Sequence, residues 1–339
     1  MVAPGRRVRA GVSFCSGQYG REVGAMKTDD AQATILLVSR IASDGTSPLT
    51  ALQFWKLVTD VGHPGALLGM TADDLMSAGL AADMAGRVVG LLARATAMAF
   101  ALERLDQSGI ATLTPFDDGY PQRLRTSLGP KAPAVLHAAG ALELLNEGGV
   151  GVVGSRNVSD KGAQVAAALG RQAVSINVSL ISGAARGVDQ LAMNAAFEAG
   201  GDVIGVPAHS LSRTLRASSV RRAIHDGRTV LCTPYAPNAP FSVGQAMGRN
   251  KLIYALSDVT VAVAADKGSG GTWSGATEAM KGRYCRVAVW RGPGEGPGNE
   301  ALDGMGAIPI SDTSELQNIL DSHPSEDEKS PLPEQVSLF

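Results

Sequence analysis

From residue 150 onward, short runs of β-branched residues alternate with segments of helix length, and this alternation constrains the fold more than any other feature. A strand that returns to its sheet through a helix lies parallel to its neighbour, and the helices then cover both faces of the sheet. We therefore predict an α/β fold whose ligands bind in the loops at the carboxyl ends of the strands. The predicted strands are 150–153, 178–181, 203–206, 229–231, 259–263 and 286–290.

The pattern divides the chain into four segments. Residues 1–26 are rich in glycine and arginine and lack periodicity, so we expect disorder or a misplaced translation start. Residues 27–110 repeat apolar side chains at helical spacing and predict a small all-helical domain. Residues 111–315 carry the predicted sheet, a Rossmann-like parallel sheet with helices on both faces. Residues 316–339 are acidic and rich in serine and proline, which predicts a disordered tail.

The composition, with 45% hydrophobic and 18% charged residues, is that of a globular protein. No run approaches the roughly 18 apolar residues of a membrane span, so we expect a cytoplasmic protein without membrane contact. Cys15, Cys232 and Cys285 form no CxxC pair, and we expect neither a disulfide framework nor a metal site. Residues 120–283 hold 17 lysines and arginines against 10 aspartates and glutamates. This excess permits an anionic ligand such as nucleic acid, although a solvated surface explains it equally well.

The loop at 154–162 joins the first of these strands, 150–153, to a helix and combines glycines with Arg156. A helix start exposes unpaired N–H groups at the positive end of the helix dipole, and a guanidinium adds a bidentate donor, so the loop suits a phosphate. A turn that is simply capped by Ser159 or Asp160 is the alternative explanation. The loop is neither a P-loop nor a GxGxxG dinucleotide motif.

Three further segments combine glycine with basic or polar residues near the same predicted edge of the sheet. Residues 182–189 follow the second strand, residues 248–251 precede a helix, and residues 268–272 follow the fifth strand. Each segment alone is a weak signal. Four of them in one domain favour a shared anion-binding groove over four independent turns.

The order and spacing of these segments resemble those of the DprA/Smf family of DNA-processing proteins. Residues 154–162 resemble the family's GSRxxSxxG, residues 182–189 its SGxAxGxD, and residues 249–258 its RNRIIAGLSD. A YPxxL lead-in at 120–124 and a closing GxN…GA at 298–307 extend the resemblance over most of the chain. The helical segment is also similar to the family's N-terminal SAM-like domain.

The resemblance implies a protein that binds single-stranded DNA on a basic face of its Rossmann-like domain, forms a homodimer and helps to load a RecA-type recombinase. We therefore predict a mediator of recombination or DNA uptake that uses no cofactor and catalyses no reaction. Its phosphate contacts would be sensitive to salt and largely independent of sequence. Ser159 and Asp189 are expected to brace the loops, as is Asn250. The predicted nucleic-acid and phosphate contacts are Gly154, Ser155, Arg156, Lys161, Ser182, Gly183, Arg186, Gly187, Arg249, Asn250, Lys251, Gly271 and Thr272.

The sequence also departs from the family pattern. Ala192-Met193 stands where the family has Ala-His, and a basic run from Arg213 to Arg222 replaces its Pro-Ala-Gly…Tyr-Pro segment. Residues 270–278 resemble instead the GGxGTxxE loop of the related lysine-decarboxylase-like (LOG) proteins, which act on nucleoside monophosphates. No C-terminal winged helix is visible in the sequence.

These departures leave an alternative open, namely a nucleotide-binding sensor or an enzyme that processes nucleoside monophosphates. Such an enzyme needs a carboxylate near the phosphate site, and Glu278 is the candidate because it follows Gly271 and Thr272 in the same helix. A glutamate that is merely favoured by the helix dipole is the other explanation. A compact pocket faced by Glu278 would favour the enzyme or the nucleotide sensor, and an open basic groove would favour strand binding.

The last five residues, QVSLF, look like the QL[SD]LF peptide by which bacterial replication and repair proteins dock on the sliding clamp. Gln335 offers a polar anchor and Ser337 stands at the variable position, while Leu338 and Phe339 offer apolar side chains to a preformed groove. A chance match at an apolar chain end is the alternative. We predict a clamp-binding peptide in the tail.

Overall fold

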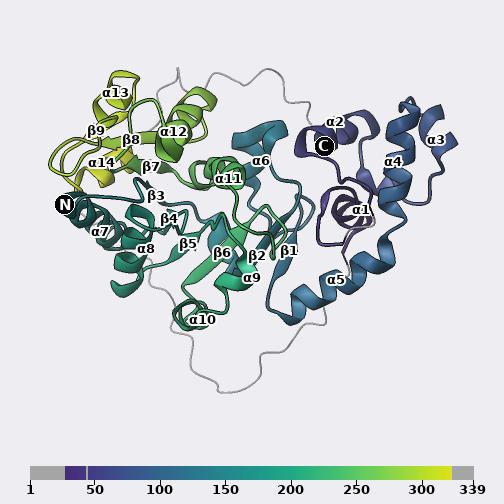
Figure 1. Cartoon of the computed structure of the whole chain (residues 1–339), viewed down its shortest axis with the longest axis horizontal. Coiled ribbons are helices and arrows are strands. Elements are labelled where there is room, and N and C mark those ends of the chain that lie inside the picture. Colours follow the sequence, from purple (N-terminus) through teal and green to yellow (C-terminus); the bar gives the residue numbers. More distant parts are fainter. Residues whose placement is uncertain (1–26, 43–44, 323–339) are drawn as a thin grey trace, which may run out of the picture.

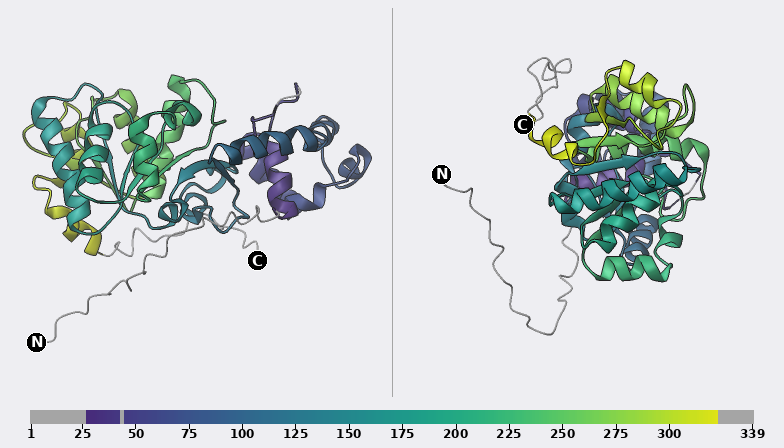
Figure 2. Two further views of the ribbon diagram at one scale, coloured as in Figure 1. Left: turned by 90° about the horizontal axis from the view of Figure 1, so that it is seen from below. Right: turned by 90° about the vertical axis from the view of Figure 1, so that its left-hand side faces the viewer.

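The computed structural model describes residues 27–42 and 45–322, which form a helical lobe beside a larger α/β lobe (Figures 1 and 2). This arrangement confirms the predicted α/β class and the all-helical region that precedes the sheet. The disorder expected at 1–26 and the clamp-binding peptide expected at 335–339 lie outside the described residues.

Side-chain caps define where several helices of the helical lobe begin. Thr50 and Thr71 each form a capping box with the residue three positions on, Gln53 and Asp74 respectively, which satisfies backbone N–H groups that the helix leaves unpaired. The apolar faces of these helices meet in one core around the fully buried Phe54. The helices are α1 (Asp29–Val38), α2 (Ala51–Val61), α3 (Ala72–Ser77), α4 (Ala82–Leu92) and α5 (Ala95–Gln107), with a 3-10 turn, η1 (Pro64–Leu67), after α2.

Trp55 of α2 joins the helical lobe to the chain that leads into the sheet. Its indole Nε1 donates a hydrogen bond to the carbonyl of Ala132 at 2.9 Å, and the Arg125 guanidinium lies 3.7 Å from the centre of its ring. An ion pair between Lys27 and Asp117, 3.0 Å long, adds a second tie. A buried hydrogen bond combined with a cation–π contact holds the two lobes together.

No single helix within 27–42 and 45–322 is long and apolar enough to cross a membrane. Only α4 and α5, which are bent by 52° at their junction, pass that test of length and composition as a pair. Their apolar side chains Val88, Leu91 and Met98 are buried inside the lobe.

The described residues of the α/β lobe form one nine-stranded sheet of order β1-β2-β6-β5-β4-β3-β7-β8-β9. All pairs from β6 to β9 in this order are parallel, as predicted. The prediction of a purely parallel sheet was incomplete, because β1 and β2 add an antiparallel edge. Their sequences, ATL and LHAAG, hold one β-branched residue between them, so no β-branched run marked them. The strands are β1 (Ala111–Leu113), β2 (Leu136–Gly140), β3 (Val150–Val153), β4 (Leu180–Ser182), β5 (Val203–Gly205), β6 (Thr229–Thr233), β7 (Val259–Ala262), β8 (Arg286–Trp290) and β9 (Ile308–Ile310).

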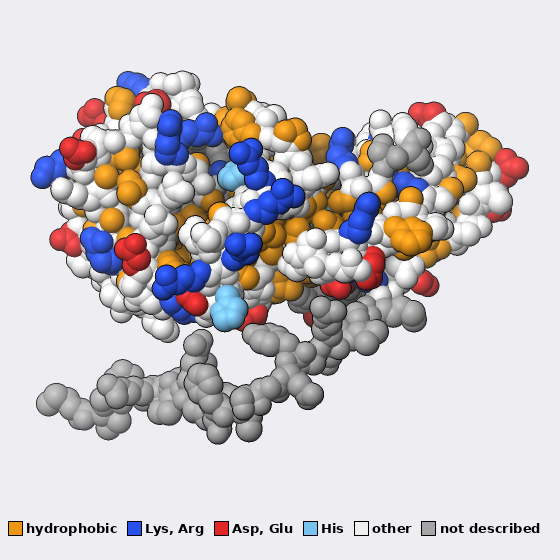
Figure 3. Space-filling view, turned by 60° about the horizontal axis from the view of Figure 1, so that its bottom comes forward, with side chains coloured by type: hydrophobic (Ala, Val, Ile, Leu, Met, Phe, Trp, Pro, Cys, Tyr) orange, Lys and Arg blue, Asp and Glu red, His pale blue; other side chains and the backbone are white. Residues whose placement is uncertain are grey.

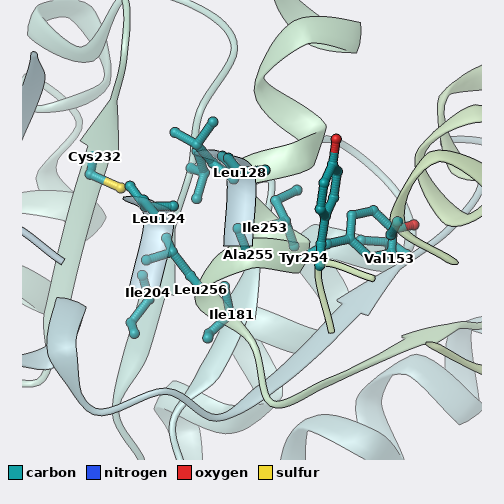
Figure 4. Packing of buried hydrophobic residues seen from close by; sticks show 14 of the residues in the cluster. Leu124, Leu128, Val153, Ile181, Ile204, Cys232, Ile253, Tyr254, Ala255 and Leu256 are labelled. Atoms are coloured by element: carbon teal, nitrogen blue, oxygen red, sulfur yellow. The ribbon is translucent and has the colours of Figure 1, made fainter. Parts of the chain in front are cut away.

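Helices cover both faces of the sheet (Figure 1). One face packs against α7, α8 and α14, and the other packs against α6, α11, α12 and α13. Figure 4 shows part of the second core, where Leu124, Leu128 and Ile253 from the helices pack with Ile181 and Ile204 from the strands. The helices are α6 (Gln122–Leu128), α7 (Asp160–Ser175), α8 (Val188–Glu198), α9 (Leu211–Thr214), α10 (Ser218–His225), α11 (Val243–Leu256), α12 (Gly270–Gly282), α13 (Asn299–Gly304) and α14 (Glu315–Asp321), with 3-10 turns η2 (Gly129–Lys131) and η3 (Leu142–Asn146).

Helix α14 corrects the predicted start of the disordered tail at residue 316. Leu316 and Ile319 stand three positions apart, so they share one face of the helix, and both are buried against the sheet. The guanidinium of Arg286 on β8 donates to the carbonyls of Ile319 and Ser322. The folded domain therefore continues past 316 because this short segment still buries apolar area.

Candidate nucleic-acid-binding site

The order of the strands reverses beside β3. The chain first builds β4, β5 and β6 to one side of β3, and then crosses back to place β7, β8 and β9 on the other side. In parallel α/β sheets the loops at such a switch point diverge and leave a crevice at the carboxyl ends of the strands. A pocket of about 390 Å³ lies at this point, between the loops after β3 and β7, helix α11 and the start of α12.

The loop after β3 forms one wall of the pocket with Gly154, Ser155 and Arg156. The Ser155 N–H donates to the carbonyl of Ala264 at 2.9 Å, which ties this loop to the one after β7. Ser159 caps α7 and lies outside the wall; its hydroxyl accepts the Gly162 N–H at 3.2 Å. Arg156 itself is exposed, so its guanidinium is available to a ligand in the pocket.

Arg249 of α11 lies in the pocket wall and is only 3% exposed. Its Nη2 donates to the carbonyl of Gly183 at 2.8 Å and its Nη1 to Oδ1 of Asn250 at 3.0 Å, whereas its Nε finds no partner among the described residues. A Cβ at position 183 would overlap this guanidinium, so the close approach requires glycine. Burial lowers the pKa of Arg249, an effect that Asp189 opposes. A buried cation with an unused donor favours an anion in the pocket.

Asp189, at the start of α8, lies behind Arg249. Burial raises the pKa of this carboxyl to about 6, although the charge of Arg249 and the backbone N–H groups of Ala185, Gly183 and Gly154 act in the opposite direction. The Ala185 N–H reaches a carboxylate oxygen at 3.4 Å. Asp189 therefore connects the loops after β3 and β4, and it offsets part of the charge of Arg249 at neutral pH.

The start of α12 forms the opposite wall with Gly271 and Thr272. The side-chain nitrogen of Asn250 donates to the carbonyl of Gly271 at 3.1 Å, so Asn250 holds α11 against α12. Tyr254, one turn further along α11, also lines the pocket, and Figure 4 shows its side chain beside Ile253. Its hydroxyl is buried and has no hydrogen-bond partner in the described ranges. Two residues of the pocket wall, Arg249 and Tyr254, thus each hold a buried polar atom that has no hydrogen-bond partner in the described ranges.

Other predicted contacts lie outside the pocket wall. Lys161 is exposed on the first turn of α7, and Arg186 is exposed with its Nη2 3.4 Å from Oδ1 of Asn157. Ser182 is buried and donates to the carbonyl of Val152 at 2.6 Å. The residues brought together at the pocket are Gly154, Ser155, Arg156, Asp189, Arg249, Asn250, Gly271 and Thr272, and those outside it are Ser159, Lys161, Ser182, Gly183, Arg186, Gly187 and Lys251.

Glu278 does not face the pocket. Its Oε1 accepts a hydrogen bond from the Tyr284 hydroxyl at 3.0 Å and lies 3.5 Å from Nζ of Lys131. Lys251 lies in the same surroundings, where burial lowers its pKa and the charge of Glu278 raises it. The carboxylate that the nucleotide-enzyme alternative needs is therefore engaged elsewhere, and Lys251 lies with it outside the pocket wall.

The pocket also has an apolar rim that was not predicted from the sequence. Phe241, Val243 and Met247 line it and are 48%, 71% and 37% exposed. The Arg156 guanidinium lies 5.5 Å from the centre of the Phe241 ring. Apolar residues just before the Gly-Arg-Asn-Lys segment were the available signal, because exposed apolar side chains beside basic ones are typical of binding sites.

Asn299 was matched to the closing motif without a role, and the structure shows what it contacts. It is fully buried, and its side-chain nitrogen donates to the carbonyls of Val263 and Trp290, both at 2.8 Å. Its side-chain oxygen accepts the Ala265 N–H at 2.9 Å. Asn299 thus holds together the carboxyl ends of β7 and β8, where the pocket wall begins.

Comparisons with known proteins agree with this architecture. Residues 111–316 match the model of the family described as DNA recombination-mediator protein A. The DNA processing protein DprA of Bacillus subtilis (strain 168) is 27% identical over 243 residues, which cover 71% of this chain and 79% of the relative.

Two solved structures share the fold. DNA processing protein A from Streptococcus pneumoniae has a TM-score of 0.58 at 22% identity, covering 81% of this chain and 99% of the other. DNA processing protein A from Helicobacter pylori has a TM-score of 0.51 at 23% identity, covering 62% and 95% respectively. Because the family model matches more than half of the sequence, the chain belongs to the DNA recombination-mediator protein A family.

Proposed function

We propose that this chain binds single-stranded DNA and mediates recombination without catalysing a reaction. The observation that carries the proposal is the pair of guanidiniums at the switch-point pocket, Arg156 exposed and Arg249 buried with an unused donor. Two cations among glycine-rich loops suit a phosphodiester backbone. The Helicobacter pylori relative is described by its single-stranded DNA binding mode, and the matched family is one of recombination mediators.

In this proposal the phosphates and the bases are bound by different parts of the pocket. Arg156 and the N–H groups of the surrounding loops contact phosphates, while Phe241 and Met247 on the rim offer apolar surface to bases. Stacking on an aromatic ring tolerates every base, and phosphate contacts carry no sequence information. The site would therefore accept any strand, as a general mediator requires.

A nucleotide-binding sensor is the second candidate function. The pocket volume of about 390 Å³ favours it, because small-molecule sites usually enclose about 300–1,000 Å³. The position of Glu278, paired with Tyr284 and Lys131 outside the wall, argues against a reaction that uses this carboxylate. A sensor would bind a nucleoside monophosphate at the same two guanidiniums without cleaving it.

Fluorescence anisotropy distinguishes these functions. A labelled single strand of about 20 nucleotides is titrated with the full chain over a salt series, with duplex DNA and nucleoside monophosphates as competitors. We expect the strand to bind more tightly than either competitor and to weaken steeply as salt rises. Glu278→Gln should leave this binding unchanged. Binding of a monophosphate without strand binding would replace the proposal with the sensor. Cleavage of a monophosphate that is lost in Glu278→Gln would replace it with the nucleotide enzyme.

The wider role follows from the family. We infer that the protein loads a RecA-type recombinase onto single strands in recombination or DNA uptake, that it acts in the cytoplasm and that it forms a homodimer. A strand-exchange assay, in which the chain must relieve inhibition by a single-strand-binding protein, tests the loading step. Light scattering of the full chain tests the dimer, and a monomer at all concentrations would exclude it.

The terminal peptide is proposed as a contact with the sliding clamp. Gln335, Ser337, Leu338 and Phe339 match the docking motif, and apolar residues at a chain end suit a preformed groove. We expect removal of residues 335–339 to abolish retention of the chain on immobilised clamp while leaving strand binding intact. Equal retention of the shortened chain would refute the contact.

A further inference from the structure

Helices α9 and α10, with the residues between them, carry a cluster of basic side chains on the α/β lobe. Residues 209–228 hold five arginines against a single acid, Asp226. Figure 3 shows lysine and arginine side chains gathered across the face of the larger lobe that this view brings forward. The segment includes the basic run that replaces a motif of the resembled family. The positive charge of residues 209–228 is therefore not part of the motifs by which the chain resembles the family, and it needs its own explanation.

The charged face of α10 is held on a rigid support. Val220 and Ile224, on its apolar side, pack against the sheet beside Leu231 and Leu211. Arg222 lies on the opposite side of the helix and Arg221 on its flank, and both are exposed to solvent. Because Val220 and Ile224 pack on the lobe, the backbone of α10 is held against it and both arginines stand on the outer surface.

No carboxylate in the described ranges forms an ion pair with the four exposed arginines of this segment. The ion pairs of these ranges involve other cations. Unpaired guanidiniums close together repel one another, so their clustering favours an anionic partner. The four residues, called here the arginine cluster, are Arg213, Arg216, Arg221 and Arg222.

A second hollow, of about 670 Å³, lies at the start of the arginine cluster. Arg213 and Arg216 line one side of it, and Asn238 and Pro240 line the other. The next residue along the chain, Phe241, lines the switch-point pocket. The two hollows therefore share one loop as a common border.

Further contacts fix this border. The Ser210 hydroxyl and the Ser212 N–H both donate to the carbonyl of Pro237 at 2.9 Å, which attaches the shared loop to α9. Burial lowers the pKa of His209, and the positive charges of Arg249 in the pocket and Arg213 in the arginine cluster lower it further. The charges of these two arginines therefore both act on His209.

We propose that a single strand leaving the switch-point pocket crosses the loop at Pro240 and binds its next phosphates on Arg213 and Arg216, continuing toward Arg221 and Arg222. The proposal depends on the strand-binding function proposed above. A flexible single strand can follow two hollows around a loop. Duplex DNA has a persistence length of about 150 base pairs, so it cannot bend sharply enough to do the same. The arginine cluster would then determine the length of strand that the protein holds.

The test compares a short oligonucleotide of about 6 nucleotides with a long one of about 20. In the double variant Arg213→Gln/Arg216→Gln we expect the affinity for the long strand to fall about 10-fold. The slope of log affinity against log salt should decrease by about 1.4, because the variant loses two phosphate contacts and each contributes about 0.7 on a single strand. Affinity for the short strand should not change. The matched control, Arg171→Gln/Lys281→Gln, removes two exposed charges outside both hollows and should leave both affinities unchanged.

Each other outcome identifies what fails. Unchanged binding of the long strand in the variant, with the wild-type chain binding both strands, would overturn the second contact and leave the proposed function intact. An equal loss for duplex DNA would assign the surface to duplexes and overturn the proposal. Failure of the wild-type chain to bind any strand would refute the proposed function and this inference together. Circular dichroism checks folding, and Arg221→Gln/Arg222→Gln repeats the test on α10.

Discussion

Arg156→Ala is expected to lower the affinity for a single strand about 10-fold or more. The guanidinium is exposed at the pocket and has no carboxylate partner within the described ranges, so its replacement removes a phosphate contact with little effect on folding. Hydrogen bonds to charged groups contribute about 1.5–3 kcal/mol, and the lower end applies to an exposed contact. The slope of log affinity against log salt should fall by about 0.7. Anisotropy titrations at several salt concentrations measure both quantities.

The control for this variant is Arg171→Ala, which removes another exposed arginine, on α7 and outside the pocket. It should bind like the wild-type chain. Arg156→Lys keeps the charge and loses the bidentate geometry, so an intermediate affinity is expected. If Arg156→Ala and Arg171→Ala bound the strand equally well, the pocket would not be the strand-binding site.

Asn299→Ala is expected to destabilise the α/β lobe by about 3 kcal/mol. The change leaves the carbonyls of Val263 and Trp290 and the N–H of Ala265 without their buried partner. Each unsatisfied buried group costs about 1–3 kcal/mol, and relaxation of the loop recovers part of the sum. Because these groups stand where the pocket wall begins, strand affinity should also fall in conditions where the variant is folded. Urea unfolding followed by circular dichroism measures the free energy.

The matched control is Asn318→Ala, an exposed asparagine of α14 whose side chain makes none of these contacts. It should change the free energy of unfolding by less than about 0.5 kcal/mol. A similarly small change in Asn299→Ala would show that its three hydrogen bonds are replaced by water, and that the ends of β7 and β8 are held by their own pairing.

The periodicity of the sequence determined much of the fold. The runs at 150–153 and 286–290 coincide with β3 and β8, because parallel strands that are buried on both faces read as nearly continuous apolar runs rich in valine. The glycine-rich loops at 154–162 and 268–272 also indicated which edge of the sheet would carry the pocket, since the carboxyl ends of parallel strands share one edge.

Only the tertiary structure decided which basic residues share the pocket. Arg249, Asn250 and Lys251 are consecutive residues of α11. Because successive residues of a helix point about 100° apart, the three side chains leave the helix in different directions. Arg249 is buried beneath Gly183, Asn250 reaches Gly271, and Lys251 lies near Glu278 outside the wall. A sequence pattern gives spacing along the chain, whereas the surroundings of each side chain depend on which elements pack against that face of α11.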